Sequence, residues 1–243
     1  MRSLQEILDY SQPVAIALGS IVVNKYEANE CHFPVSLAFS ANISPGVEGS
    51  PLIHAFLHVD QEVYKDHPLY DQFLRVLDAE KESNPELRFY FNSMSYCSLE
   101  DIQDSFKELI SDVWFGGHYY FRYVLPLLKK YKFLDSLSPE QMRLVDDYAF
   151  DTVSLYLFDR FYGLGSSNPE FMSSTCKDLF NHFEELNATS GSNIFKGTKL
   201  TDIYLDLFGE VPDFLSASST CIHRSDAIIR IFCGLLRRMG TPA

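Results

Sequence analysis

The chain has 243 residues and a formal net charge of -13, from 33 acidic and 20 basic side chains. This acidity argues against unspecific binding to phosphate backbones, which requires a basic surface, but it leaves room for a local basic groove. A chain of this length with 46% hydrophobic residues can bury one large core. We therefore predict a single domain over residues 1–243.

The cysteines and the apolar runs bear on the compartment. Five cysteines, odd in number and scattered along the chain, do not form the framework of a secreted disulfide-rich domain. They predict an intracellular protein, cytoplasmic or nuclear, in a reducing compartment. The apolar run 13–23 is too short to span a bilayer and has no basic flank of a signal peptide. It predicts a buried strand and no membrane association.

The stretch from Ser20 to Val59 organises the predicted fold. It contains three apolar runs of strand length, rich in Val, Ile and Phe, in residues 20–29, 30–43 and 51–59. Asn/Glu-rich and Ser-Pro-Gly turn chemistry separates these runs, as in a three-stranded antiparallel meander. A short helix over residues 2–11 is predicted before it.

Helical patterns dominate the remainder of the chain. A strand is predicted at 86–94 and another strand or turn at Gly116–Gly117, with 188–197 as a linker. Strands first and helices later predict an α/β (α+β) fold with a mixed sheet, in which about 138–198 is a helical insertion or extension. The predicted helices span residues 66–83, 99–110, 138–163, 170–186, 199–209 and 222–239.

Aromatic and basic side chains gather between His118 and Lys132. Such a run can stack the bases of single-stranded nucleic acid while its cations contact phosphates. Packing in the core is the alternative for a run of this kind. The last helix carries further arginines, which either touch phosphate or complement the helix C-terminus. The candidates for RNA binding are Tyr119, Tyr120, Arg122, Lys129, Lys130 and Arg224.

A zinc site is one interpretation of Cys221, His223 and Cys233, since zinc prefers four nitrogen or sulfur ligands. Cys31 and His32 are possible further ligands from the meander. If 222–239 is one helix, however, residues 223 and 233 lie about 15 Å apart along it. The alternative is that Cys233 is a buried thiol and His223 a residue of the first helical turn.

Four segments in order resemble the DEDDh exonucleases, which have an RNase H-like fold. The meander resembles the opening strands of that family, and 150–158 resembles the segment after its fifth strand. Residues 199–209 resemble the short helix before the last motif, and 221–239 resemble the final helix. The resemblance implies an RNase H-like fold and a site where carboxylates hold two divalent metals.

The carboxylates that the resemblance requires are largely missing. Asn24 and Tyr26 stand at the positions of the first Asp and the Glu, and Ile228 stands at the position of the last Asp. His223 matches the general-base histidine. The middle acid is either replaced by Arg122 or retained as Glu100 or Asp101, depending on which segment is matched. Amide, phenol and alkyl groups cannot hold hard divalent cations.

Within this class the chain is most similar to the Maelstrom domain of germline piRNA silencing factors, in which a Glu-Cys-His-Cys set replaces the carboxylates. Residues 221–234 resemble the Cys, His and Cys run of that domain, and 30–43 resemble its second strand. The spacing here is Cys-x-His and not Cys-x2-His, and Ser36 stands where the Glu is expected. The similarity implies single-stranded RNA binding and silencing partners.

Together these observations predict a catalytically inactive binding module in RNA metabolism or small-RNA silencing. We expect a protein partner and contacts to single-stranded RNA, no obligatory cofactor, and zinc as an option. An active 3'–5' exonuclease with displaced carboxylates is the alternative, and only this alternative needs Mg²⁺ or Mn²⁺. A structural scaffold that binds no nucleic acid is a third hypothesis. The displaced carboxylates would be Glu27, Asp101, Asp151 and Asp226.

Overall fold

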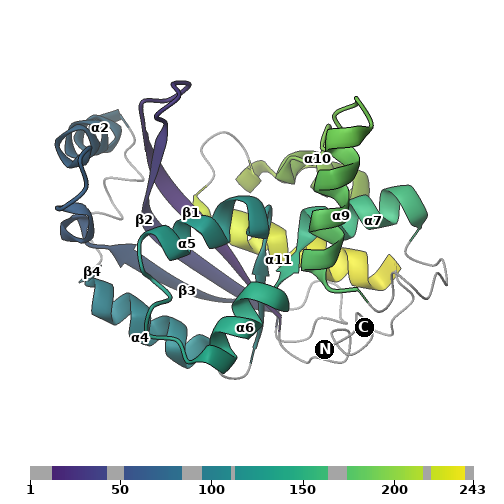
Figure 1. Cartoon of the computed structure of the whole chain (residues 1–243), viewed down its shortest axis with the longest axis horizontal. Coiled ribbons are helices and arrows are strands. Elements are labelled where there is room, and N and C mark those ends of the chain that lie inside the picture. The colour runs from purple at the N-terminus through teal and green to yellow at the C-terminus, as the bar shows by residue number, and fades with distance from the viewer. Residues whose placement is uncertain are drawn as a thin grey trace.

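A six-stranded mixed sheet forms the centre of the computed structural model, with helices on both faces (Figure 1). The prediction of an α/β fold with a mixed sheet is confirmed. The strand order is β4-β3-β2-β1-β5-β6. The structure describes residues 13–42, 52–83, 95–110, 113–163, 174–215 and 220–238.

The predicted meander forms the middle of the sheet. Strands β1 (Pro13–Val23), β2 (Cys31–Asn42) and β3 (Leu52–Val59) pair in antiparallel fashion. The register of β1 and β2 shifts between Gly19 and Ser20, which marks a β-bulge. Strand β1 begins at Pro13, so it includes the apolar run 13–23 that the sequence predicts to be buried.

Three short parallel strands extend the sheet. Strand β5 (Trp114–Gly117) pairs with the first part of β1, and β6 (Phe150–Asp151) pairs with β5. Strand β4 (Tyr96–Cys97) pairs with the end of β3 on the other side. The last pair between β1 and β5 is Ile16 with Gly117, so β1 continues past the end of β5.

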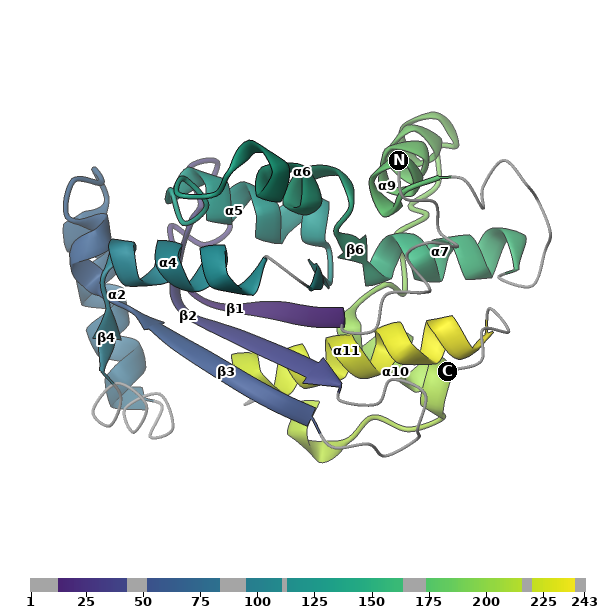
Figure 2. The same ribbon diagram turned by 90° about the horizontal axis from the view of Figure 1, so that it is seen from below.

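The side chains of β1 alternate between two cores. Val14, Ile16 and Leu18 pack in one core, whereas Ala15 and Ala17 face the other. Figure 2 shows the corresponding layers, with α4, α5 and α6 on one side of the sheet and α10 and α11 on the opposite side. Small alanines suit the second face because α11 packs directly on β1 and β2.

The helices divide between these cores as follows. The first core is covered by α2 (Tyr70–Ser83), α4 (Leu99–Leu109), α5 (Leu125–Lys130) and α6 (Pro139–Asp147). The second is covered by α7 (Thr152–Tyr162), α9 (Cys176–Thr189), α10 (Leu200–Phe208) and α11 (Cys221–Arg238). The chain also forms the short helical turns η1 (Gln61–Tyr64), η2 (Tyr120–Val124) and η3 (Asp213–Leu215).

The predicted helix 138–163 is wrong as one continuous element. Strand β6 interrupts it, because Phe150 and Asp151 pair with β5 in the sheet. Asp151 then accepts hydrogen bonds from the backbone N–H groups of Val153 and Ser154, which restarts the chain as α7. The region 138–198 thus supplies a strand as well as helices.

Two other predictions meet different outcomes. The predicted linker 188–197 ends in a packed loop, since Ile194 and Phe195 are buried against the second core. The predicted helix 2–11 and the predicted strand 86–94 lie outside the described residues. All five cysteines are free thiols.

Candidate functional site

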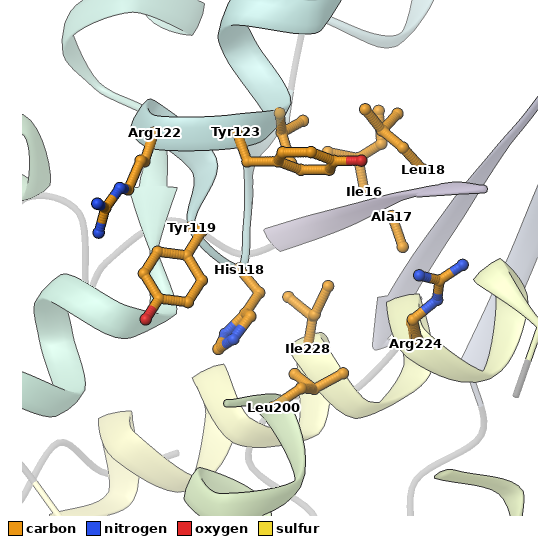
Figure 3. Close-up of a pocket in the computed structure, with 11 residues that line it drawn as sticks. Ile16, Ala17, Leu18, His118, Tyr119, Arg122, Tyr123, Leu200, Arg224 and Ile228 are labelled. Atoms are coloured by element: carbon orange, nitrogen blue, oxygen red, sulfur yellow. The ribbon is translucent and has the colours of Figure 1, made fainter. Parts of the chain in front are cut away.

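A pocket opens where β1 runs past the end of β5. Its volume is about 530 Å³, and residues from β1, the segment after β5, α10 and α11 form its walls (Figure 3). Apolar side chains make up most of the lining, with two arginines at its sides. The described lining residues are Ile16, Ala17, Leu18, His118, Tyr119, Arg122, Tyr123, Val124, Leu200, Arg224 and Ile228.

The segment after β5 has an unusual backbone. Tyr119 has φ 50° and ψ 41°, in the left-handed region that a residue with a large side chain rarely adopts. The π-helical turn Tyr120–Val124 follows it at once. Such turns and left-handed non-glycine residues cluster at functional sites. Here they place Tyr119, Arg122 and Tyr123 in the wall of one pocket.

Hydrogen bonds to neighbouring elements hold this segment in place. The Tyr119 hydroxyl pairs with the buried Thr198 hydroxyl, and His118 Nδ1 lies 3.0 Å from Thr152 Oγ1. Desolvation lowers the pKa of His118 to about 4, although a hydrogen bond to the Thr198 backbone opposes the shift. The imidazole is therefore neutral at pH 7, and the positive charge of the pocket comes from its arginines.

Arg122 lies on the rim beside α9. Its guanidinium carbon is 5.3 Å from the centre of the Phe195 ring, within the range of a cation–π contact. Its Nη1 is 3.7 Å from Glu184 Oε1, and its side chain is 53% exposed. An ion pair this long and this exposed contributes little, so Arg122 remains available to a ligand.

Arg224 approaches the pocket from the first turns of α11, opposite Arg122 in Figure 3. Its Nε atom is buried without a hydrogen-bond partner, as are those of Arg230 and Arg237 on the same helix, but of these three arginines Arg224 is the one that lines the pocket. Arg224 forms no ion pair with any carboxylate in the described part of the chain. A buried donor without an acceptor costs free energy, and a charged donor costs more. An anionic ligand in the pocket would compensate the charge of the guanidinium group.

The pocket thus combines positive charge with apolar walls in an acidic protein. Among the described residues that line it, none is an aspartate or a glutamate. Its lining includes Tyr119 and Tyr123, aromatic side chains of the kind that stack on planar ligands. The arrangement suits a ligand with a planar ring and negative charges, and it provides no carboxylate pair for acid–base or metal chemistry.

The structure brings together only some of the residues that were matched to nuclease positions. Arg122 and Ile228 do line one pocket. Asn24 and Tyr26 lie in the turn after β1 and are not among the residues that line this pocket. The strand residues that line the pocket are Ile16, Ala17 and Leu18, because the pocket starts where β5 ends.

His223 is a half-buried residue in the first turn of α11. Its Nδ1 lies 3.4 Å from the Thr220 backbone nitrogen, and its ring packs against Phe214 at 5.8 Å. It is not among the residues that line the pocket. The neighbouring Arg224 lines it instead.

Only some of the residues predicted to bind RNA line the pocket. Tyr119, Arg122 and Arg224 line the pocket. Tyr120 does not, because it is fully buried and its hydroxyl donates to the Val145 carbonyl. The lysines of α5 lie outside it as well: Lys129 pairs with Asp146 at 2.7 Å, and Lys130 Nζ lies 3.0 Å from Cys31 Sγ.

The set Cys221, His223 and Cys233 is not brought together, because α11 is one continuous helix from Cys221 to Arg238. Twelve residues along a helix separate the two thiols by about 18 Å. Cys221 Sγ contacts Ser36 Oγ at 3.2 Å, and Cys233 Sγ lies 3.9 Å from Asn42 Nδ2. Within the described ranges, no group of three or more His, Cys, Asp or Glu residues is arranged to hold a metal ion.

The carboxylates proposed as displaced ligands belong to separate elements. Asp101 closes the capping box of α4 with Ser98, and Glu100 lies beside it in the same first turn. Asp151 caps α7, and burial raises its pKa to about 6 despite four backbone hydrogen bonds.

The other two carboxylates have partners elsewhere. Asp226 Oδ1 accepts a hydrogen bond from Ser40 at 2.5 Å and lies 2.9 Å from His54 Nδ1. Glu27 lies in the turn after β1, where its backbone nitrogen donates to the Asn24 carbonyl.

Several pocket residues were not predicted. Ala17, Leu18 and Leu200 are ordinary apolar residues, and nothing in their local sequence distinguishes them from the core. The Gly116–Gly117 pair was the available signal, since glycines at a strand end permit close approach of other chain segments. A Cβ at Gly116 would lie 2.2 Å from the Phe150 carbonyl oxygen.

Comparison with known proteins gave no match: no family model fits the chain, and neither a curated protein nor a solved structure resembles it significantly. In the part of the chain that the structure describes, no helix is both long enough and apolar enough to cross a bilayer.

Proposed function

We propose that this protein is a catalytically inactive, RNase H-like module that binds single-stranded RNA in the pocket between Arg122 and Arg224. The main support is Arg224, a half-buried cation that lines a pocket and pairs with no described carboxylate. In a chain of net charge -13, such a cation is best explained by an anionic ligand. RNA metabolism, and in particular small-RNA silencing, is the process in which we place it.

The strand order supports the RNase H-like part of the proposal. An opening antiparallel meander is followed by parallel strands on the side of β1, and the last helix packs on the meander. The resemblance of the sequence likewise places the meander first and a long helix last in the chain. Ser36 and Cys221, which stand at the positions of the Glu and a Cys of the Maelstrom domain, also lie in contact across β2 and α11.

The shape of the pocket supports RNA as the ligand. A volume of about 530 Å³ is sufficient for one nucleotide and excludes a duplex. Aromatic faces and arginines are the groups with which proteins stack unpaired bases and contact phosphates. We further propose a protein partner, since the remaining acidic surface repels nucleic acid.

The competing function is an active exonuclease that uses displaced carboxylates. An exonuclease requires acidic oxygens that meet around divalent cations. In the described structure Asp101 and Asp151 cap α4 and α7, and Asp226 lies within α11. We therefore favour binding without cleavage.

Fluorescence anisotropy with a labelled single-stranded oligouridine at low salt tests the proposal. Arg224→Gln should weaken binding by roughly 10-fold, because a charge-assisted hydrogen bond contributes about 1.5–3 kcal/mol. The matched control is Arg75→Gln on the exposed face of α2, which removes the same charge away from the pocket. Its affinity should remain close to that of the wild type.

Two results would contradict the proposal. One is a flat titration of the wild-type protein with single-stranded RNA at low salt. The other is an equal loss of affinity in Arg75→Gln and Arg224→Gln, which would show that only the total charge matters.

A further inference from the structure

The turn between β1 and β2 presents an aromatic ring to solvent. Tyr26 is 88% exposed, and the Nζ atom of Lys25 lies 5.1 Å from the centre of its ring. In Figure 1 the hairpin formed by β1 and β2 projects beyond α5. A ring this exposed adds nothing to the core, so whatever it contributes is contributed at the surface.

The backbone holds this ring in an unfavourable conformation. Tyr26 has φ 69°, and Asn24 in the same turn has φ 54°. Asparagine tolerates this region, whereas a bulky aromatic residue rarely adopts it. The Tyr26 N–H donates to Glu30 Oε2 at 2.7 Å, which fixes the turn. Strain that the surrounding structure maintains is typical of functional positions.

The free part of β1 connects this turn with the pocket. Beyond Ile16, β1 has no pairing with β5, and Leu18 to Val23 covers about 17 Å. Tyr123, which lines the pocket, lies between the two ends of this path. Its hydroxyl is 3.1 Å from His32 Nδ1, and the two rings meet edge to face at 5.3 Å.

We infer that Tyr26 is a second stacking platform for the RNA strand that occupies the pocket, an inference that rests on the proposed function. The strand would run from the pocket past Tyr123 and stack one base on Tyr26, with a phosphate near Lys25. Glu27 and Glu30 are the acidic groups of the same turn. They oppose the phosphate contact but not the stacking, because a nucleobase carries no charge at neutral pH.

Binding of oligouridines from about 2 to about 10 nucleotides long tests this inference, since known single-strand sites cover comparable lengths. Tyr26→Ala should lower the affinity for the longest oligonucleotides roughly 10-fold and leave the affinity for the shortest ones unchanged. Tyr26→Phe should bind like the wild type, because stacking uses only the ring. Phe161→Ala, which removes another exposed aromatic ring on α7, is the matched control and should have no effect.

A further variant separates the loss of stacking from misfolding. Tyr26→Asn removes the ring but introduces a residue that tolerates positive φ, so its Tm should equal or exceed that of the wild type. Equal affinity of Tyr26→Ala and wild type at every length would overturn the inference, and the proposed function would stand if Arg224→Gln still weakened binding. Absence of RNA binding at any length would overturn both.

Discussion

The buried His58 on β3 makes the stability of the fold sensitive to acid. The residue is buried, and its ring stacks on Tyr96 at 4.5 Å. Desolvation, together with the nearby Lys81 cation, lowers the pKa of His58 to about 4, against a small opposing effect of Asp60. The folded state therefore binds fewer protons than the unfolded state between about pH 6.5 and pH 4.

Stability should consequently fall as the pH decreases through this window. The shift corresponds to at most about 3 kcal/mol, all of it present above pH 6.5 and lost once the pH is below the folded pKa. His58→Phe keeps a ring against Tyr96 and removes the titrating group. Urea unfolding at about pH 7.5 and about pH 4.5 should show a smaller difference between the two conditions in the variant than in the wild type. An equal difference would contradict this assignment.

Among the elements, β5 depends on a glycine for its pairing. A Cβ at Gly116 would lie 2.2 Å from the carbonyl oxygen of Phe150 in β6, and a backbone atom in a paired strand cannot easily move away. Gly116→Ala should lower the free energy of unfolding by at least about 2 kcal/mol. At the adjacent Gly117 the nearest atom is the Ile16 carbonyl oxygen at 3.2 Å, so Gly117→Ala should cost less. Urea denaturation of both variants measures the difference, and equal losses would argue against tight pairing of β5 with β6.

The long elements of the fold could be predicted from the sequence, and the short strands could not. The meander was predictable because its apolar runs are long and turn residues separate them. The starts of α4 and α6 were predictable because Ser98 and Ser138 form capping boxes with residues three positions later. Strands β5 and β6 contain only four and two residues. Runs this short have no periodicity, so their pairing arises from tertiary contacts alone.

The candidate site was predictable only in part for a related reason. Arg122, Arg224 and Tyr119 stood out as basic or aromatic residues, but their meeting depends on β5 ending beside Ile16. Because that pairing was not predicted, the sequence alone did not indicate that Ile16, Ala17 and Leu18 line the pocket, and the resemblance pointed to Asn24 and Tyr26 further along the same hairpin. In the structure these two residues lie in the hairpin turn, whereas the pocket lies beside the middle of β1.

At the scale of the whole molecule, net charge and local charge oppose each other. A net charge of -13 repels RNA over distances of roughly a Debye length, about 10 Å at 0.1 M salt. Contact with two arginines in a partly enclosed pocket is screened less. We therefore expect the protein to capture an unpaired segment selectively rather than to coat RNA tightly, and to do so without a divalent cation.

The most direct test of this claim is to incubate a 5'-labelled single-stranded RNA with the protein in excess EDTA and, in parallel, in Mn²⁺, and to follow both binding and RNA length. We predict equal affinity in the two conditions and RNA of unchanged length after prolonged incubation. Shortening of the RNA that appears in Mn²⁺, is absent in EDTA and disappears in Asp226→Ala would contradict the account. Binding that requires the metal would contradict it as well.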